Sequence, residues 1–433
     1  MLKRQDWSDF EQWKANSGRR GLLVTGARQV GKTYLIREFA KANYKSFAEI
    51  NLFENKKAAE VINAAENTED FFSRLSLLAD TKLIPGETLI FIDEIQECRE
   101  IITAIKFLVE RYDFEFVISG SLLGVELKDV RSVPVGYLDV VHMKPMNFCE
   151  YLIARNMDEE FIKVVKKSLW ERSPVPGYIH DAFIKLFHEY LIVGGMPAAV
   201  SEFVSSNDLK SVRLIQENII SLNKWDISKY RNDSALLIKN MYEMIPAELN
   251  NQNKRFIFKS MNERARFSRY MDSLVWLADA GVALPVFCVD EPVYPLKLSS
   301  ATNLFKLFLS DVGLLTSTFM KETTLEILAK NPNVNYGAIY ENVVAQELHA
   351  AGFSPYYYRN KKRGELDFVI ENVHGKIFPI EVKSGKDYKR HNALSNLLKT
   401  EEYGLEEGIV LCEDNVSKDG KVTYLPVYMA GFI

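Results

Sequence analysis

A glycine-rich segment near the N-terminus has the residue types and spacing that bind phosphate. It consists of Gly26, Ala27, Arg28, Gln29, Val30, Gly31, Lys32 and Thr33. A short apolar run at 22–24 precedes it and helical spacing of apolar residues follows at 35–39, so the order is strand, loop, helix. In this context the glycines let backbone N–H groups close around phosphates, and the helix N-terminus favours negative charge. We expect Lys32 to reach the β and γ phosphates of ATP and Thr33 to hold Mg²⁺.

Two acids end the next strongly apolar run of the chain. The stretch TLIFIDEIQ is continuously apolar from Leu89 to Ile92 and then carries Asp93 and Glu94, as expected for a central strand buried on both faces. Acids at the carboxyl end of such a strand face the ligand crevice. We expect Asp93 to bind Mg²⁺ through water and Glu94 to orient or deprotonate the attacking water. Ser119, at the end of the following apolar strand, is either a sensor of the γ-phosphate or simply part of a turn.

A second group of charged residues lies near the C-terminus. Asp367 falls in GELDFVI, and Glu381 and Lys383 stand two apart in FPIEVKSGK. The period of a strand puts Glu381 and Lys383 on one face. The segment 372–376 predicts a hairpin with a three-residue loop ending in Gly375, in a register that sets Asp367 opposite Glu381.

Opposed carboxylates repel one another, so a positive charge is expected near them. A divalent metal held by Asp367 and Glu381 would supply it, and Lys383 would then position or activate a water for attack on a phosphodiester. Glu341, in the helical stretch IYENVVAQEL, offers a further acid. Two alternatives stay open: an ion triad in which Lys383 neutralises the acids, and a fold that only binds.

The elements that position these residues follow from the apolar pattern. Short apolar strands near 22–25, 46–52, 88–93 and 115–119 alternate with helical stretches, which predicts an α/β domain with a parallel sheet and helices on both faces. Between about 232 and 300 the pattern reads three helices and then two extended pieces, ALPVFCV and YPLKLS, which suits a winged helix. Basic residues there are either phosphate contacts or a solvated face. These are Lys254, Arg255, Lys259, Arg264, Arg266 and Arg269.

Composition limits the class of protein. The chain has 433 residues, too many for one core, with 47% hydrophobic and 26% charged residues, as in soluble globular proteins. The net charge of −4 argues against a wholly basic nucleic-acid coat but leaves a local basic face open. The four cysteines are widely spaced, which disfavours a zinc site or disulfide framework and fits a reducing cytoplasm. No apolar run reaches a bilayer span, and we expect no membrane association.

The motifs GARQVGKT, FIDEIQ and VISGSLL resemble those of AAA-type P-loop ATPases of prokaryotes that carry a C-terminal region of unknown function (DUF4143-like). The stretches YLIVGGMPAAV, KLFLSDVGLL and GAIYENVVAQEL match further landmarks of that family, so the resemblance covers nearly the whole chain. It implies an AAA ATPase module, and it too points to a winged helix. One departure is Gly136-Tyr137, where many relatives carry Gly-Arg, and this makes ATP hydrolysis less secure than ATP binding.

An acid followed by Glu-x-Lys, with a glutamate on a preceding helix, is similar to the restriction-endonuclease-like nucleases. Glu341, Asp367, Glu381 and Lys383 fill the four positions. Basic residues flank the motif and suit a phosphate backbone. They are Lys361, Lys362 and Arg363 before it, and Lys386, Lys389, Arg390 and His391 after it.

The sequence therefore predicts three domains: an ATPase at 1–155, a helical and winged-helix connector at 156–300, and an α/β restriction-endonuclease-like domain at 301–433. We expect a cytoplasmic protein that binds and hydrolyses ATP with Mg²⁺ and whose ATP cycle regulates a nuclease-like domain acting on DNA or RNA. The alternative is a nucleotide-dependent switch in which an inactive nuclease-like domain recognises nucleic acid or a protein partner. The sequence does not fix the oligomeric state or the source of an arginine finger.

Overall fold

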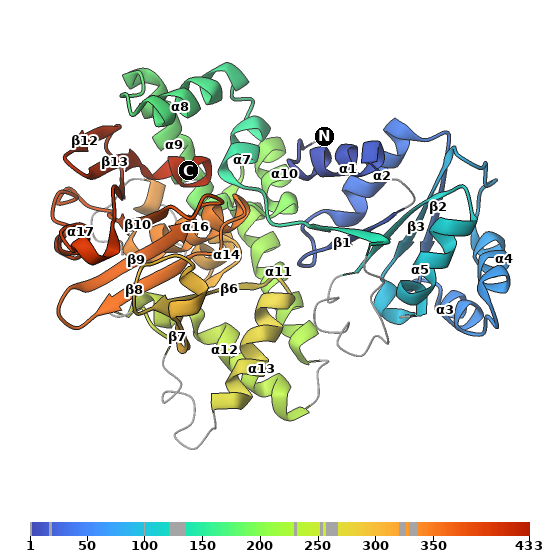
Figure 1. The fold of residues 1–433 in the computed structure, drawn as a ribbon. Coiled ribbons are helices and arrows are strands. Elements are labelled where there is room, and N and C mark those ends of the chain that lie inside the picture. The colour runs from blue at the N-terminus through green and yellow to red at the C-terminus, as the bar shows by residue number, and fades with distance from the viewer. Residues whose placement is uncertain are drawn as a thin grey trace. The chain divides into compact units, whose positions relative to one another are not determined.

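The computed structural model describes residues 2–16, 20–98, 100–120, 136–228, 232–251, 254–256, 267–319, 326–328, 334 and 336–433. The chain divides into two compact units, an N-terminal unit of residues 3–144 with 279–281, and a C-terminal unit of 145–278 and 282–433. Both units are drawn in Figure 1. The predicted ATPase boundary at 155 thus lies about one short helix beyond the division at 144.

The N-terminal unit is built on a parallel sheet of five strands in the order β2-β3-β4-β1-β5. Its elements are α1 (Asp6–Asn16), β1 (Gly21–Thr25), α2 (Lys32–Asn43), β2 (Ser46–Asn51), α3 (Lys56–Asn63), α4 (Thr68–Leu78), β3 (Thr88–Asp93), α5 (Glu100–Arg111), β4 (Glu115–Ser119) and β5 (Leu138–His142). In Figure 1, α1 and α2 lie on one face of the sheet, and α3, α4 and α5 on the other. The four strands predicted from the sequence, their parallel arrangement and the two helical layers are confirmed.

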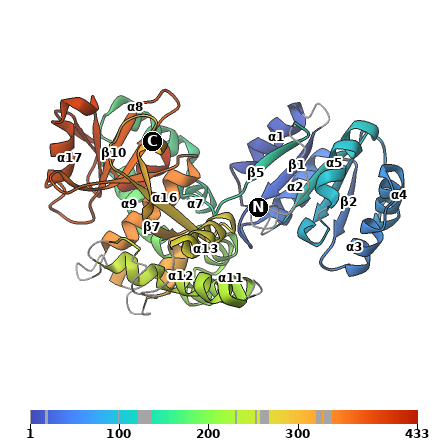
Figure 2. The same ribbon diagram turned by 60° about the horizontal axis from the view of Figure 1, so that its bottom comes forward.

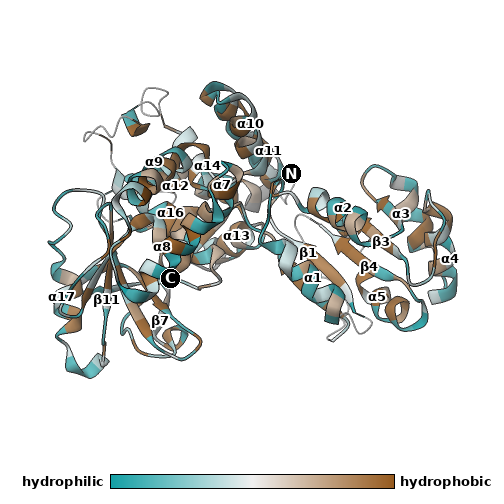
Figure 3. Ribbon diagram, turned by 90° about the horizontal axis from the view of Figure 1, so that it is seen from above, coloured by the Kyte–Doolittle hydropathy of each residue, from teal (hydrophilic) through white to brown (hydrophobic). Residues whose placement is uncertain are grey.

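The centre of this sheet is apolar because both of its faces are covered. Every residue of β1 and of β3 is buried, and Figure 3 shows both strands in the brown of apolar residues. A continuous apolar run is the sequence pattern of a strand between two helical layers. Because β1 and β3 both run parallel to β4, Asp93 at the polar end of β3 lies at the same edge of the sheet as the loop that follows β1.

The C-terminal unit combines a helical layer with a sheet of eight strands in the order β12-β13-β11-β10-β9-β8-β6-β7. Its helices are α7 (Phe148–Ala154), α8 (Glu159–Glu171), α9 (Gly177–Val193), α10 (Pro197–Ser206), α11 (Leu209–Ser228), α12 (Asn232–Asn250), α13 (Phe267–Asp279), α14 (Val312–Ser317), α16 (Tyr336–Ala350) and α17 (Asn392–Leu398). Its strands are β6 (Ala283–Val289), β7 (Ser300–Leu309), β8 (Tyr356–Asn360), β9 (Gly364–Glu371), β10 (Ile377–Val382), β11 (Gly408–Cys412), β12 (Ser417–Asp419) and β13 (Val422–Pro426). In Figure 2, α16 and α17 lie on either side of β10.

The structure corrects the predicted connector at 156–300. YPLKLS forms a 3-10 helix at Leu296–Ser299 rather than a strand of a wing, and the partner of β6 is instead β7. β6 also pairs with β8, so both strands belong to the C-terminal sheet and residue 300 is not a boundary between compact units. The sequence misled us because a strand pair at the edge of a larger sheet has the same local pattern as an isolated two-stranded wing.

Three segments of the C-terminal unit that are distant in sequence meet in its buried centre. The turn between α9 and α10 brings the N–H of Gly195 to Asp311, whose Oδ2 accepts at 2.5 Å. Gln346 of α16 accepts from the N–H of Val312 at 2.8 Å, and its amide donates to the hydroxyl of Tyr190 at 2.8 Å. The turn requires glycine at this position, because a Cβ on Gly195 would lie 1.9 Å from the carbonyl oxygen of Met146.

Among the described residues, no helix by itself is long and apolar enough to cross a membrane. The bent pair α9 and α10 passes the length and composition test only when the two are taken together across a 120° bend. Much of α9 is buried in the C-terminal unit, as the core helix of a folded domain would be.

Candidate functional site

The glycine-rich loop takes backbone conformations that only glycine adopts without strain. Gly26 has φ of +137°, and a Cβ on it would lie 2.2 Å from the carbonyl oxygen of Met143. Gly31, which caps α2, has φ of +96°. A side chain at either position would open the loop, so the two glycines of the motif are required by the local geometry. The N–H groups at the start of α2 lack helical partners and are suited to donate hydrogen bonds to an anion.

Lys32 lies inside this loop. Its ammonium donates to the carbonyl oxygens of Gly26 and Ala27, both at 3.0 Å. Burial lowers the pKa of Lys32 to about 8, although the nearby carboxylates of Glu94 and Asp93 oppose that shift. In the structure the loop carbonyls satisfy the ammonium, and the predicted contact of Lys32 with the β and γ phosphates stays a prediction.

A hydrogen-bonded chain joins the loop to the end of β3. The hydroxyl of Thr33 donates to Oδ2 of Asp93 at 3.0 Å, and the hydroxyl of Ser119 donates to Oδ1 of the same carboxylate. Burial raises the pKa of Asp93, and the two hydroxyl bonds work against that rise. Thr33 and Asp93 thus place oxygen atoms side by side at the edge of the sheet, and this donor set fits Mg²⁺. The hydroxyl of Ser119 is bonded to Asp93 here, and its predicted role as a phosphate sensor stays a prediction.

Glu94 follows directly in a left-handed conformation, with φ of 57° and ψ of 49°. This turns the chain sharply after β3 and starts the 3-10 helix Ile95–Glu97. The side-chain amide of Gln96 donates to Glu94 Oε2 and fixes the carboxylate. We did not single out Gln96 from the sequence, although it stands in the quoted motif FIDEIQ, two residues after the predicted base.

Tyr137, where relatives often carry arginine, contacts α5. The ammonium of Lys106 lies 4.9 Å from the centre of the Tyr137 ring. A hydrogen bond to Glu110 raises the pKa of the Tyr137 hydroxyl. The side chain is therefore held by residues of α5 and offers no positive charge to a nucleotide.

In the C-terminal unit the hairpin has the predicted register. β9 and β10 are antiparallel, with Phe378 opposite Ile370 and Ile380 opposite Phe368, so Asp367 and Glu381 are the next positions along. Gly375 has φ of +77° in the loop. The N–H of Val382 donates to Asp367 Oδ2 at 2.8 Å, which holds the carboxylate beside β10.

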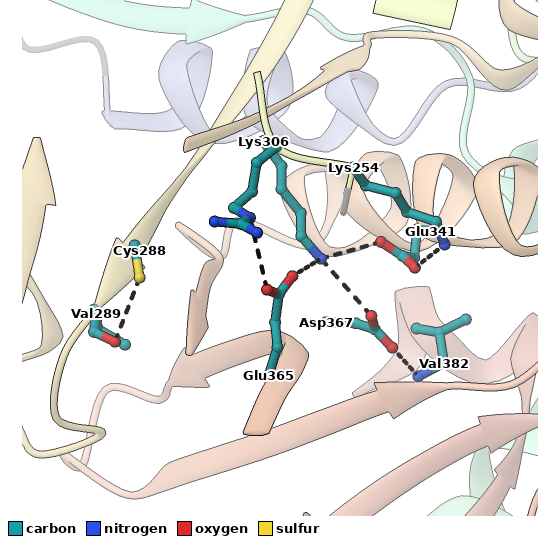
Figure 4. Close-up of polar contacts among 9 residues, drawn as sticks. Lys254, Cys288, Val289, Lys306, Glu341, Glu365, Asp367 and Val382 are labelled. Carbon is teal, nitrogen blue, oxygen red and sulfur yellow. Dashed lines mark hydrogen bonds and ion pairs between the residues drawn. The ribbon is translucent and has the colours of Figure 1, made fainter. Parts of the chain in front are cut away.

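The four predicted residues are arranged as two groups of ion pairs. Lys383 Nζ lies 2.7 Å from Glu381 Oε1, while Oε2 of Glu381 is buried without a hydrogen-bond partner. Glu341 and Asp367 instead share Lys306 of β7, at 3.3 Å and 3.8 Å from the ammonium. Figure 4 shows this lysine among the acids. A positive charge therefore lies beside each acid: Lys383 beside Glu381, as one of the open alternatives had it, and Lys306, from a distant strand, beside Asp367 and Glu341.

Further residues complete the cluster around Lys306. Its ammonium lies 3.4 Å from Glu365, and Lys254 pairs with the second oxygen of Glu341. Arg255 Nε lies 3.9 Å from Glu365. We had considered Lys254 and Arg255 as contacts for a nucleic-acid backbone, but the structure pairs both with acids of the cluster. Lys306 and Glu365 were missed because nothing in the local sequence marks a lysine or glutamate as buried.

Electrostatics within the cluster favour charge sharing. Burial would lower the pKa of Lys306, but Glu341, Asp367 and Glu365 together outweigh it and raise that pKa. Burial would raise the pKa of Glu341, but Lys306 and Lys254 lower it. Burial and the nearby Glu341 raise the pKa of Asp367 to about 7. Two acids in contact thus titrate apart, one ionised and one partly protonated near neutral pH.

A divalent metal fits this arrangement poorly. Within the parts of the chain that the structure describes, no group of three or more His, Cys, Asp or Glu side chains is placed to hold a metal ion. The oxygens of Glu341 and Asp367 that would face a metal already face the Lys306 ammonium. The assignment of Asp367 and Glu381 as metal ligands stays a prediction. The position of Lys306 beside Asp367 argues against it.

The basic residues around the motif fall into two classes. Five of them are exposed: Lys361, Lys362, Lys386, Lys389 and Arg390. Arg363 is half-buried and donates to the hydroxyl of Tyr403 at 2.8 Å. His391 is buried and hydrogen-bonded to Tyr424 at 2.8 Å, so it does not belong to a basic rim. Lys259, Arg264 and Arg266 lie outside the described residues, as does the side chain of Arg269.

Comparison with solved structures finds partial likenesses. The chain is 14% identical to the Walker-type ATPase PABY2304 of Pyrococcus abyssi, with 73% of this chain and 95% of that chain covered and a TM-score of 0.43. For PCH-2 of C. elegans the identity is 17%, the coverage 46% and 58%, and the TM-score 0.28. For CDC6P from Pyrobaculum aerophilum the identity is 11%, with 76% of this chain and 95% of that chain covered and a TM-score of 0.27. No curated protein matches the sequence.

Comparison with family models divides the chain into three matched regions. Residues 184–325 and 336–429 match two domains of unknown function, DUF8612 and DUF4143. The DUF8612 region spans residue 300, where we expected a domain boundary. Residues 18–152 match the AAA domain. Together with the loop, lysine and strand-end acids described above, this match identifies an AAA domain in the N-terminal part of the chain.

Proposed function

We propose that the protein is an ATP-hydrolysing switch in which the nucleotide state of the N-terminal unit controls recognition of nucleic acid by the C-terminal unit. The hydrogen bond from Thr33 to Asp93 is the observation that carries the ATPase part. It joins the phosphate loop to the end of β3, so the two groups expected to hold Mg²⁺ are already adjacent. Preorganised polar groups of this kind need little rearrangement when substrate binds.

Each residue of the ATP site has a distinct role in this proposal. The N–H groups from Gly31 onward bind phosphate oxygens, and Lys32 adds a positive charge on the β and γ phosphates. Thr33 and Asp93 would hold Mg²⁺, which neutralises phosphate charge when it is bound. Glu94 orients the attacking water and accepts its proton, in an orientation fixed by the Gln96 amide.

Glu94→Gln tests the ATPase. We expect this variant to bind ATP as the native chain does but to lose turnover by about 10²- to 10⁴-fold, the range for removal of a general base. Glu97→Gln is the matched control, since Glu97 is exposed and three residues away. Equal turnover in the native chain and Glu94→Gln would refute the assigned role.

For the C-terminal unit the geometry favours recognition over cutting. The four residues of the nuclease-like motif are all engaged in ion pairs or backbone hydrogen bonds. Among the described residues, these contacts leave Oε2 of Glu381 as the one oxygen of the three carboxylates without a partner, so little remains to hold a metal ion that would polarise a phosphodiester. The exposed lysines and Arg390 near the motif support contact with a phosphate backbone.

Two assays separate these readings. Binding to a DNA or RNA duplex should weaken as salt rises, and the double variant Lys389→Ala/Arg390→Ala should reduce the salt slope by about two phosphate contacts, whereas Lys418→Ala, also exposed, should not. The second assay incubates nucleic acid with Mg²⁺ or Mn²⁺, with and without ATP. Cutting that Lys383→Ala abolishes, with ATP binding intact, would establish a nuclease and overturn the recognition reading.

A further inference from the structure

Lys306 is the most enclosed charged side chain of the acidic cluster. It is only 1% exposed, and it extends from β7 to the acids carried by α16 and β9. Its ammonium lies within 3.3 to 3.8 Å of one oxygen from each of Glu341, Glu365 and Asp367. Figure 4 shows these carboxylates converging on the lysine nitrogen.

The rest of the cluster balances the remaining charge. Lys254 pairs with Glu341, and Arg255 lies near Glu365. Among the described residues, three acids therefore meet three basic side chains. Buried charges persist when they are paired, and each charge of this set lies within 4.0 Å of an opposite charge without an added ion, although Arg255 Nε makes no hydrogen bond with a described residue.

We propose that Lys306 is the resident cation of this cluster and occupies the position where the nuclease-like arrangement of acids would otherwise hold a divalent metal. A metal bound to the same oxygens would lie within about 4 Å of the ammonium, and like charges at that distance repel strongly in a buried site. The lysine cannot relieve this by turning to solvent, because it is enclosed. The native chain then binds no divalent metal through Asp367.

The three acids are not placed to hold a metal while Lys306 lies between them, and removing the lysine should let them draw together around one. Lys306→Met keeps the length of the side chain but leaves Glu341, Glu365 and Asp367 short of a positive charge, and carboxylate oxygens are good ligands for Mn²⁺. Lys306→Arg keeps the charge and serves as the matched control. The inference concerns metal binding alone and stands apart from the ATPase and from nucleic-acid recognition.

The test measures Mn²⁺ binding to the full chain without nucleotide, by loss of the electron paramagnetic resonance signal of free Mn²⁺. Thr33→Ala is included in every variant to remove the Mg²⁺ ligand of the N-terminal unit. We expect no Mn²⁺ site with Lys306 or Lys306→Arg. We expect one Mn²⁺ site per chain in Lys306→Met, and its loss when Asp367→Asn is added.

Two results would overturn the proposal. One is Mn²⁺ binding by the chain that retains Lys306, with loss of that binding in Asp367→Asn. The other is a folded Lys306→Met chain that binds no Mn²⁺. If Lys306→Met does not fold even with Mn²⁺ present, the chain that retains Lys306 is compared with the same chain carrying Asp367→Asn. Mn²⁺ binding that is lost with Asp367→Asn refutes the proposal. Absence of Mn²⁺ binding from both chains supports it.

Discussion

Glu347 of α16 gives the sharpest prediction about stability, because it is a carboxyl group buried among other acids. It is 3% exposed, and its Oε1 accepts from the N–H of Phe148 and the hydroxyl of Tyr190, both at 3.0 Å. Burial raises its pKa from 4.5 to about 8; the two hydrogen bonds oppose the rise, and the charges of Glu150 and Asp311 add to it.

The sign of the pH effect follows from this raised pKa. Between the unfolded value of 4.5 and the folded value of about 8, the folded chain binds more protons than the unfolded chain. Stability contributed by Glu347 is therefore fully present at low pH and is lost as pH rises through this window. From these two pKa values the loss between about pH 6 and about pH 8.5 is about 2.5 kcal/mol.

Glu347→Gln removes this dependence. Glutamine keeps the oxygen that accepts from Phe148 and Tyr190 but does not ionise, so the stability of the variant relative to the native chain should improve by about 2.5 kcal/mol between about pH 6 and about pH 8.5. The matched control is Glu401→Gln, which changes an exposed glutamate of the same unit.

The assay must report on the C-terminal unit alone, since a chain of two units need not unfold in one step. Urea unfolding followed by hydrogen exchange of peptides from α9 and α16 meets this need. A stability difference between Glu347→Gln and the native chain that is the same at both pH values would refute the reasoning.

Three further predictions test packing, hydrogen bonding and the phosphate loop. Gly195→Ala should destabilise the C-terminal unit by about 3 kcal/mol or more, because its Cβ would lie 1.9 Å from the Met146 carbonyl oxygen, whereas Gly177→Ala, with no atom within 4 Å, should not destabilise it in the same denaturation assay. Asn342→Ala should cost about 2 to 5 kcal/mol in urea unfolding, because the buried amide bonds both the N–H and the carbonyl of one residue of β7, at 2.9 and 3.0 Å. ATP affinity should fall by up to about tenfold per pH unit above about pH 8, because Lys32, with a pKa of about 8, must be protonated to bind phosphate. A fluorescent ATP analogue measures this, and Lys32→Arg should remove the slope between about pH 8 and about pH 9.5.

The candidate ATP site was readable from the sequence because its residues are close together along the chain. Gly26, Gly31, Lys32 and Thr33 lie within one loop and helix start, and their spacing alone determines the backbone path. To place Asp93 near this loop, one further inference was needed: the carboxyl ends of parallel strands lie at the same edge of a sheet. Gln96 was not singled out, because its role depends on the sharp turn at Glu94, which the apolar pattern does not reveal.

The C-terminal unit shows where local pattern is insufficient. The register of β9 and β10 followed from a short hairpin, and it was predicted correctly. The wing expected between 283 and 299 was wrong, because strand pairing across the sheet depends on β8, which lies more than 60 residues further along. An edge pair and an isolated wing look alike in sequence until their partners are known.

By itself, the sequence determined the parallel sheet of the N-terminal unit, its glycine-rich loop and strand-end acids, and the facing positions of Asp367 and Glu381. These depend on periodicity and on contacts between near neighbours, which residue order specifies directly. Only the tertiary structure decided that Lys306, from a strand 35 residues before Glu341, provides the positive charge beside the acids. Which charges neutralise one another in a buried cluster depends on packing between distant elements, and no local pattern of residues encodes it.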